Sequence, residues 1–595
     1  MKRLVIALLL STAIAVQPAL AATAIRNVRL FDGIRVVPRA NVVFDHGIIT
    51  AAGPNAAIPA GAEVIDGSGK TLMPGLIDSH AHAYGPALER ALRFGVTTEL
   101  DMFTTVEAMK QWHAEQAAGP VTNRADIRSA GILVTVKGGH GAEYFPIPTY
   151  ATGDDAQAFI DARIAEGSDY IKFIVDTGEA YGIHFETLRA GDLKSLIAAA
   201  HKRRKLAVVH VGTLADARMA IDAGADGLAH IFSDRPPDAD FGRFAAAHRV
   251  FVIPTLTVLE SASGVPSGAS LIGDARLKPF LAGNEITNLK SAFPKRAASK
   301  VDLGHAKAAV RQLKAARVPI LAGSDSPNPG TAHGASMHRE LELLVEAGLT
   351  PTEALAAATS TPAKAFKLDD RGRIAKGLRA DLLLVNGDPT ANIKATRDIA
   401  AIWKNGARLR REPEAPSAQS EIESIASEKL ASGIISNFDS GAAKAEIGSE
   451  WFISTDQMAG GKSNATMSVV DGGAAGTPKA LHVVSEINEG FGFPWAGAMA
   501  FFGSKPMSPV DLSSKKGLTF LAKGNTDIRV MVFAKRLGRI PAQTTVHAGS
   551  DWTELTVLWS DLGLEGNDVQ AVLFSGTAAG KSEFTIDELR LSSPR

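Results

Sequence analysis

The amino-acid sequence predicts an α/β TIM-type (β/α)8 barrel, combined with a small composite β-sandwich domain and followed by a C-terminal all-β module. Between residues 71 and 370, short apolar runs alternate with Ala-rich helical stretches. Residues 22–70 and 371–411 have strand-like alternation, and residues 433–595 have many Gly/Ser/Asp turns but few helical signals. A chain of 595 residues is also too long for one ordinary hydrophobic core, so several domains are expected.

Eight apolar runs are the expected barrel strands. Continuous apolar strands suit a parallel sheet that is buried on both faces, and eight β–α alternations are what a TIM-type barrel requires. The expected strands are residues 72–78, 96–101, 127–134, 170–175, 206–211, 227–231, 250–256 and 318–324.

The segments on either side of the barrel complete the expected organisation. Residues 22–70 and 371–411 are expected to pair in the small β-domain, which leaves 71–370 as the barrel. The Pro- and Glu-containing stretch from Glu412 to Ser417 predicts a linker over residues 412–432, ahead of a separate domain at 433–595.

The N-terminus has the composition of a cleavable signal peptide. Met1-Lys2-Arg3 is positively charged, Leu4 to Val16 is apolar, and Ala19-Leu20-Ala21 has the small-x-small pattern of a signal peptidase site. The apolar run is well short of the roughly 20 residues that a membrane-spanning helix needs. We therefore expect removal of residues 1–21, no membrane span, and a periplasmic or secreted mature protein.

The composition narrows the chemistry. Lys+Arg and Asp+Glu both number 63 and aromatic residues make up 6%, which argues against a nucleic-acid-binding surface. The chain has no cysteine, so disulfides and thiolate metal ligands are excluded. Any metal ion must be held by histidine, carboxylate or a carboxylated lysine.

Six residues capable of metal chemistry fall at or near the carboxyl ends of the expected strands, where (β/α)8 barrels gather their catalytic groups. An H-x-H pair on an extended chain points both imidazoles to the same side, and a lysine lies inside the apolar strand 170–175. A lone histidine would be better explained as structural, but six matching positions on five strands favour an active site. The six residues are His80, His82, Lys172, His210, His230 and Asp325.

The motifs around these residues resemble those of the amidohydrolase superfamily. The stretch from Leu72 to His82 looks like its first motif, and the tail segments 350–355 and 377–382 are also typical. The similarity covers roughly residues 24–410 and is greatest to imidazolonepropionase-like and Xaa-Pro dipeptidase-like enzymes. The later metal and base motifs are matched by Tyr170-Ile171-Lys172-Phe173, Val208-Val209-His210-Val211, Leu228-Ala229-His230 and Gly323-Ser324-Asp325.

This resemblance implies two divalent metal ions. His80, His82 and Asp325 would hold one ion, His210 and His230 the other, and an N6-carboxylated Lys172 would bridge them. Burial disfavours a protonated amine, which leaves the neutral amine able to capture CO2. The ions would activate a water and polarise the scissile carbonyl, with Asp325 as catalytic base. Zn2+ is expected, although these ligands also suit manganese, iron or cobalt.

Three further residues, His140, Tyr181 and His184, are expected to contact substrate. His140 lies in Gly138-Gly139-His140-Gly141 after the third strand, and the matching loop of the family reaches the reacting group or the substrate carboxylate. A turn histidine explains His140 equally well from sequence alone. Tyr181 and His184 lie in the loop after the fourth strand. Residues 257–317 form an unusually long insert, so the family's substrates cannot be transferred directly.

The C-terminal domain resembles a different family. Asn437-Phe438-Asp439, residues 454–463 and the ending from Phe584 to Leu591 are similar to a complex I intermediate-associated-protein-type domain. The resemblance implies a galactose-binding-like jelly roll, which leaves open glycan binding, packing and homo-oligomerisation. A structural Ca2+ held by Asp439 and Asp587 is a further expectation.

As a whole, the sequence predicts a metal-dependent hydrolase that cleaves a C–N amide bond of a small molecule, of the N-acyl amino acid or small dipeptide type. A cyclic amide or an ester or lactone is the alternative substrate, because the same activated water would serve it. A non-catalytic carbohydrate-binding or assembly protein with an inert barrel is a third hypothesis. The presence of all six site residues counts against it.

Overall fold

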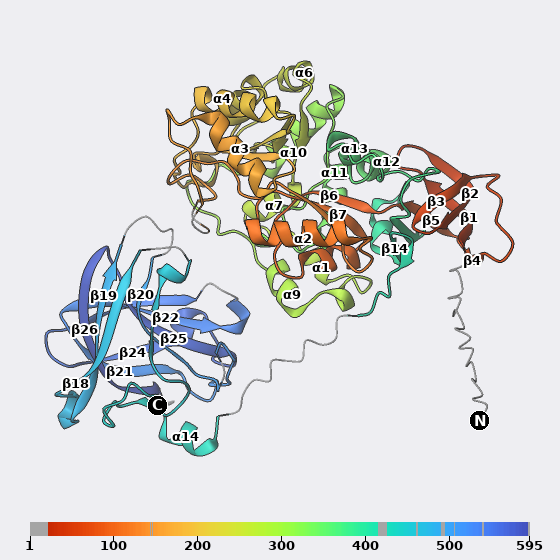
Figure 1. Ribbon diagram of the computed structural model, residues 1–595. Coiled ribbons are helices and arrows are strands. Elements are labelled where there is room, and N and C mark those ends of the chain that lie inside the picture. The colour runs from red at the N-terminus through yellow and green to blue at the C-terminus, as the bar shows by residue number, and fades with distance from the viewer. Residues whose placement is uncertain are drawn as a thin grey trace, which may run out of the picture.

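The computed structural model describes residues 22–142, 144, 147–413, 425–459, 462–488, 494–504, 506–537 and 541–592 (Figure 1). The expected signal peptide, residues 1–21, and most of the expected linker, residues 414–424, lie outside the described residues. Among the helices that the structure does describe, none has the length and apolar character needed to cross a membrane.

An eight-stranded sheet combines strands from the beginning of the chain with strands from residues 382–408. Its order is β15-β14-β13-β5-β1-β2-β3, and β4 pairs with β1. In its core, the rings of Phe44 and Trp403 pack edge to face with centroids 5.8 Å apart. The strands are β1 (Thr23–Phe31), β2 (Val36–Asp45), β3 (Ile48–Gly53), β4 (Glu63–Asp66), β5 (Lys70–Pro74), β13 (Leu382–Asn386), β14 (Ile399–Lys404) and β15 (Ala407–Arg408).

Seven parallel strands form two further sheets, of order β6-β7-β8 and β12-β11-β10-β9. Every residue in them except Arg128 is buried, which explains their continuous apolar composition. The strands are β6 (Leu76–Ala81), β7 (Val96–Asp101), β8 (Asp126–Ser129), β9 (Ile171–Val175), β10 (Ala207–Val211), β11 (Gly227–Ala229) and β12 (Phe251–Ile253).

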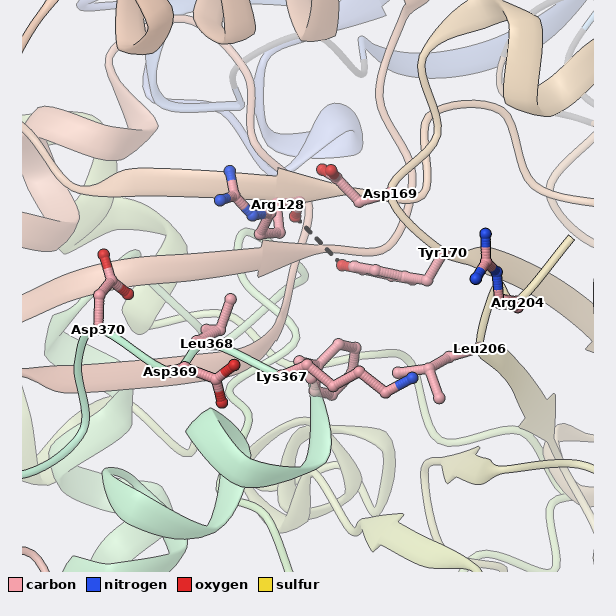
Figure 2. Close-up of a pocket in the computed structure, with 10 residues that line it drawn as sticks. Arg128, Asp169, Tyr170, Arg204, Leu206, Lys367, Leu368, Asp369 and Asp370 are labelled. Carbon is pink, nitrogen blue, oxygen red and sulfur yellow. Dashed lines mark hydrogen bonds between the residues drawn. The ribbon is translucent and has the colours of Figure 1, made fainter.

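Single parallel bridges link the two sheets: Val134 pairs with Phe173, Val252 with Ile320, and Ala81 with Ser326. At the amino end of β9, the Tyr170 hydroxyl donates hydrogen bonds to the backbone oxygens of Asp101 (2.7 Å) and Arg128 (3.2 Å; Figure 2). These contacts connect the two sheets, so that the parallel strands follow one another as in a TIM-like barrel. A fully closed (β/α)8 barrel remains a prediction.

Two expected strands differ from the structure. The strand expected at 127–134 ends at Ser129, because Gly131 has a φ of 62° that an extended strand does not allow. Residues 318–324 form one bridge, at Ile320, rather than a continuous strand. Pro319 has no N–H to donate, and the backbone oxygens of Pro319 and Ala322 accept hydrogen bonds from different strands, from the N–H groups of Val252 and Ser79.

Helices follow the parallel strands along the chain (Figure 1). Side chains cap several of them: Asp155, Thr213, Asp302 and Thr350 accept hydrogen bonds from first-turn N–H groups of α3, α5, α10 and α12. The helices are α1 (Ala87–Arg93), α2 (Val106–Ala118), α3 (Ala156–Glu166), α4 (Ala190–Lys202), α5 (Leu214–Asp222), α6 (Phe241–Ala247), α7 (Leu256–Ala262), α8 (Ala269–Ile272), α9 (Gly283–Leu289), α10 (Leu303–Ala315), α11 (Ala335–Glu346), α12 (Pro351–Ala357) and α13 (Ser360–Ala365).

The C-terminal region is all-β apart from α14 (Ser427–Ser432) and short 3-10 turns. Its antiparallel sheets have the orders β18-β19-β26-β21-β24, with β16 paired to β26, and β17-β20-β25-β22-β23. Phe520 of one sheet packs against Phe574 of the other, with centroids 4.9 Å apart. The strands are β16 (Ile434–Ser436), β17 (Phe452–Thr455), β18 (Asn464–Asp471), β19 (Lys479–Ile487), β20 (Ala496–Phe501), β21 (Gly517–Lys523), β22 (Thr526–Ala534), β23 (Ala542–Ala548), β24 (Thr553–Leu558), β25 (Val569–Gly576) and β26 (Gly580–Ser592).

A buried charge cluster joins the parallel strands to the eight-stranded sheet. The fully buried Lys404 ammonium of β14 lies 3.2 Å from Asp126 of β8 and 3.2 Å from Asp381. Arg379 also pairs with both carboxylates, at 2.7 Å and 3.0 Å. Since the charges balance locally, their burial is tolerated.

We expect Lys404→Met to lower the free energy of unfolding by about 3 kcal/mol, because it leaves two buried carboxylates with too few cations. Urea unfolding would measure this change. Lys394→Met, at an exposed position, is the control and should change stability by less than about 0.5 kcal/mol. Arg371 also pairs with Asp126, and equal stability of both variants would show that Arg371 and Arg379 alone neutralise the cluster.

Candidate metal centre and active site

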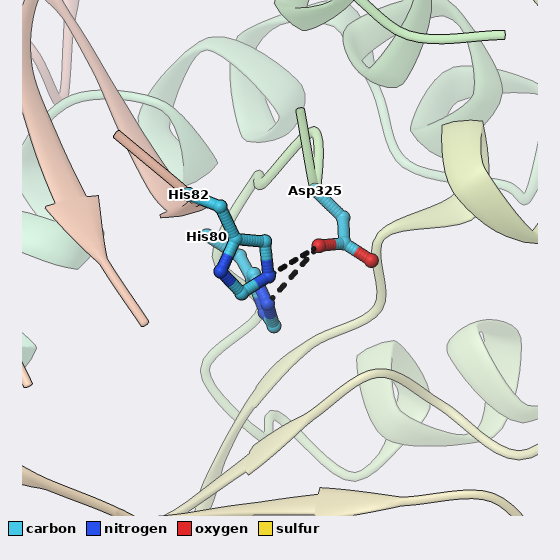
Figure 3. Close-up of side chains that lie close together, drawn as sticks. All are labelled: His80, His82 and Asp325. Carbon is cyan, nitrogen blue, oxygen red and sulfur yellow. Dashed lines mark ion pairs between the residues drawn. The ribbon is translucent and has the colours of Figure 1, made fainter. Parts of the chain in front are cut away.

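Asp325 lies at the centre of a first group of side chains at the carboxyl ends of the strands. Its Oδ1 is 3.3 Å from His80 Nε2 and 3.0 Å from His82 Nε2 (Figure 3). Its Oδ2 is 3.9 Å from His230 Nε2. Within the described part of the chain, both ring nitrogens of His80 and Oδ1 of Asp325 are buried and make no hydrogen bond. Buried polar atoms rarely stay unsatisfied, so this donor set fits a bound cation.

A second group lies beside the first. His210 Nε2 is 3.0 Å from Asp176 Oδ2, and the His140 ring is 5.0 Å from the His210 ring. His140, Asp176 and His210 offer ligand atoms that all lie within 4.8 Å of one another. The His230 ring lies 4.5 Å from His210 and 4.7 Å from His80, so it connects the two groups.

Two of the histidines contact oxygen atoms through Nδ1, the ring nitrogen that does not face Asp325. His230 Nδ1 lies 2.6 Å from Thr255 Oγ1, and His82 Nδ1 lies 3.3 Å from the Phe103 carbonyl oxygen. A carbonyl only accepts, so His82 Nδ1 is the donor in this contact, and Nε2 is the ring nitrogen that faces Asp325. Partners of this kind orient metal-binding imidazoles in proteins.

Burial keeps the imidazoles of His80, His210 and His230 neutral, which is the form that binds a metal ion. Burial holds the pKa values of His80 and His230 well below the ordinary 6.5. It lowers the pKa of His210 to about 4, against the opposing effect of its hydrogen bond with Asp176.

Lys172 is 2% exposed and lies in β9 with its neighbours all buried. Burial lowers the pKa of its amine to about 7, although Asp325 and Asp101 oppose the shift. Its ammonium forms no ion pair or hydrogen bond with any described residue. A lysine kept for its charge would be paired, so the environment favours a neutral, reactive amine.

Asp78 links the two chain segments that carry the first group. Its Oδ1 accepts hydrogen bonds from the backbone N–H groups of His80 (3.1 Å) and Ser324 (3.0 Å), and its Oδ2 from the Ser324 hydroxyl (2.5 Å). Gly323 allows this approach, because a Cβ at that position would lie 2.9 Å from the Cβ of His80. The site also stores backbone strain: His230, Asp325 and Thr255 have φ values of 69°, 54° and 48°.

The expected substrate-contact residues fall in different places. His140 belongs to the second group. Burial, with the negative charges of Asp176 and Asp325, raises the pKa of Tyr181 well above its ordinary value, which places the phenol near the site. His184 is not brought to the site: its side chain is 81% exposed and lies 3.8 Å from Glu186.

Asp176 was not predicted from the sequence. It follows β9 directly and is 1% exposed. Burial opposes its ionisation, but the hydrogen bond with His210 prevails and lowers its pKa. Its position four residues after Lys172, at the carboxyl end of a buried strand, is the signal that would have identified it.

The expected calcium ligands lie in the C-terminal region. Asp587 Oδ2 accepts hydrogen bonds from the Ala474 N–H (2.8 Å) and the Thr477 hydroxyl (2.7 Å), while Asp439 Oδ1 makes none with the described residues. No third carboxylate or histidine of the described chain joins them in a metal-binding group. The calcium site, glycan binding and homo-oligomerisation stay predictions.

Comparison with known proteins identifies the family. The sequence pattern of the Amidohydrolase family matches residues 71–409. The chain belongs to this family. Among curated relatives, imidazolonepropionase from Deinococcus radiodurans is 24% identical over 420 residues, covering 63% of this chain and 93% of the relative. Imidazolonepropionase from Cereibacter sphaeroides is 28% identical over 414 residues, covering 62% and 94%.

Solved amidohydrolase structures have the same fold. A putative prolidase from Bifidobacterium longum is 25% identical with a TM-score of 0.54, covering 67% of this chain and 97% of that protein. A Xaa-Pro dipeptidase with bound methionine in the active site is 20% identical with a TM-score of 0.53, covering 65% and 100%. The protein is therefore a metal-dependent enzyme that hydrolyses C–N bonds, with a TIM-like catalytic domain and an additional all-β region.

We expect Asp78→Ala to lower hydrolytic turnover by about a hundredfold, since displacing His80 from Asp325 by a fraction of an ångström misplaces the reacting groups. Asp78→Asn keeps an acceptor for both N–H groups and should retain most of the turnover. Initial rates on any amide that the native enzyme hydrolyses would compare them. Equal losses in both variants would mean that the charge of Asp78, and not its hydrogen bonds, is required.

Proposed function

We propose that this amidohydrolase cleaves the C–N bond of N-acyl amino acids or small dipeptides at a site for two divalent metal ions, with Zn2+ as the expected metal. The observation that supports it most is the group of histidines around Asp325, in which both nitrogens of the neutral His80 imidazole are unsatisfied, beside a buried and unpaired lysine. A site built only for stability would pair these groups with one another.

His80, His82 and Asp325 would hold one ion, and His210 and His230 the other. Bound divalent ions supply Lewis acidity, which polarises the scissile carbonyl and makes water nucleophilic at neutral pH. Asp176 extends this ligand set, because its Oδ2 lies beside the same His210 nitrogen that would face the second ion. The absence of cysteine leaves nitrogen and oxygen as the ligand atoms, which suits zinc.

Lys172 would complete the centre as an N6-carboxylated side chain. The neutral amine attacks CO2, forms a C–N bond and loses a proton, which gives an anionic carbamate. Its position among His80, His210, His230 and Asp325 would let the two carbamate oxygens serve both ions. The positive charge of Lys172 contributes to the lowered pKa values of His80, His210 and His230, and the negative charge of Asp325 acts to raise the pKa of the Lys172 amine.

Asp325 would also act as the proton carrier. One carboxylate oxygen faces His80 and His82, and the other faces His230, so the group spans the reaction site. It would accept a proton from the attacking water and return it to the leaving nitrogen. His140 and Tyr181 would contact the substrate from the loops after β8 and β9, and His184 is given no role.

A second candidate substrate class has its own support. The curated relatives are named imidazolonepropionases, and an imidazolone is a cyclic amide. Opening of a cyclic amide, or of an ester or lactone, would use the same residues, so the shape of the substrate pocket decides between them. We also propose export to the periplasm or medium, on the composition of residues 1–21.

Metal analysis of the purified protein beside Lys172→Ala tests the binuclear centre. We expect about two metal ions per native chain and a sharp fall in the variant, because the bridging ligand is lost. Lys394→Ala, at an exposed position, is the matched control. An unchanged metal content in a folded Lys172→Ala variant would contradict the carbamate.

Asp325→Asn tests the proton carrier. The amide keeps an oxygen ligand but cannot take up a proton, so metal content should stay near the native value while turnover falls by at least about a hundredfold. Rates should be measured on N-acetyl amino acids, Xaa-Pro dipeptides and cyclic amides. Undiminished turnover in this variant would remove the role given to Asp325, and native activity on cyclic amides alone would favour the second substrate class.

A further inference from the structure

A cavity of about 390 Å³ lies at the amino ends of the parallel strands, away from the metal centre (Figure 2). Asp169 and Tyr170 precede β9, and Arg204 and Leu206 precede β10, whereas Asp176 and His210 of the metal centre lie at the carboxyl ends of these strands. The remaining lining residues are Arg128 and residues 366–370. A neighbouring cavity of about 570 Å³ shares Arg128, Asp169 and Asp370 with it.

Three cations that line the cavity have no carboxylate partner among the described residues: Arg128, Arg204 and Lys367. The Arg128 guanidinium makes only a long, 3.5 Å contact with the Ile127 carbonyl oxygen, and its side chain is half-buried. A guanidinium can bind a carboxylate through two parallel N–H donors, so Arg128 is suited to an anionic ligand.

Of the three acidic residues of the cavity, Asp370 is neutralised by arginines. Asp370 pairs with Arg371 at 2.8 Å and with Arg379 at 3.3 Å. Asp169 accepts a hydrogen bond from the Ser129 N–H and lies 3.1 Å from His113 Nε2. Asp369 forms no ion pair with a described residue, so two carboxylates, Asp169 and Asp369, face the three unpaired cations, and the lining keeps a small excess of positive charge.

Apolar groups separate the cations. The rings of Tyr170 and Phe366 pack edge to face with centroids 5.0 Å apart, and both side chains are buried. Because the Tyr170 hydroxyl is bonded to backbone oxygens, its ring and not its polar end forms the wall. In Figure 2, Arg128 lies beyond the hydroxyl end of Tyr170, while Arg204 and the Lys367 ammonium lie toward Leu206.

We propose that this cavity binds a small linear dicarboxylate, as a ligand site distinct from the metal centre. Cations at both ends would each bind one carboxylate, and the Arg128 guanidinium would bind its carboxylate through two parallel hydrogen bonds. The apolar rings between them would contact the methylene chain of the ligand. The exposed positions of Arg204 and Lys367 leave the cavity open to solvent.

Calorimetric titration of the full-length, metal-loaded protein with malonate, succinate, glutarate and adipate tests the site. We expect saturable binding of at least one of them, weakened roughly tenfold or more by Arg128→Gln and similarly by Lys367→Gln. Arg243→Gln, an exposed arginine on α6, is the control and should bind like the native protein. The uncharged diamide of the tightest ligand should not bind, and added salt should weaken binding.

Dicarboxylates also bind metal ions, so the titration is repeated on protein freed of metal. Binding that persists without metal and is lost in Arg128→Gln supports the proposal. Binding that disappears with the metal and is unchanged in Arg128→Gln would place the ligand at the metal centre and overturn it. Failure of all four dicarboxylates to bind folded native protein would overturn it as well, while leaving the proposed hydrolase function intact.

Discussion

The Asp78 carboxyl group accepts hydrogen bonds from both chain segments that carry the first group of metal ligands. β6 brings His80 and His82, and residues 324–326 bring Asp325, from positions more than two hundred residues apart in the sequence. The two segments also exchange backbone bonds, from the Asp325 N–H to the His80 oxygen (2.7 Å) and from the His82 N–H to the Ser326 oxygen (2.7 Å). Burial raises the pKa of Asp78 to about 7, so keeping this carboxyl group in the interior lowers the free energy of unfolding at neutral pH.

Burial has a common effect on the groups around this contact. It removes charge from the imidazoles of His80, His210 and His230 and from the amine of Lys172, and so favours the neutral forms that can bind a metal ion or react. The same burial would make unsatisfied polar atoms costly in a protein that bound nothing there. Positive φ values at His230 and Asp325 add strain of about 1–3 kcal/mol each. At Asp325 this strain coincides with an unsatisfied carboxylate oxygen, which indicates selection for ligand binding over stability.

The sequence predicts which residues lie near the site, but not the contacts between them. Apolar runs and the H-x-H motif pointed to His80, His82, His210, His230 and Asp325, and the structure brings these side chains together, while their role as metal ligands stays a prediction. Asp176 could not be distinguished from other acids that follow strands, since its role depends on a 3.0 Å contact with a histidine 34 residues away. His184 was expected near the site because of its loop, but the backbone turns it to solvent. The strand expected at 318–324 failed for a local reason, since Pro319 lacks an N–H.

The long insert between β12 and residue 318 explains why substrate class does not follow from family membership. On one side, the Lys300 N–H donates to the Ala180 oxygen (2.9 Å), so the insert braces the loop that carries Tyr181. On the other side, the Asn288 side chain donates to the backbone oxygens of Pro327 (3.1 Å), Asn328 (2.9 Å) and Thr331 (2.7 Å), which fixes the loop after Asp325. The insert thus contacts loops on both sides of the metal centre. A relative of 20–28% identity that lacks these contacts can share every metal ligand and still present a differently shaped pocket to its substrate.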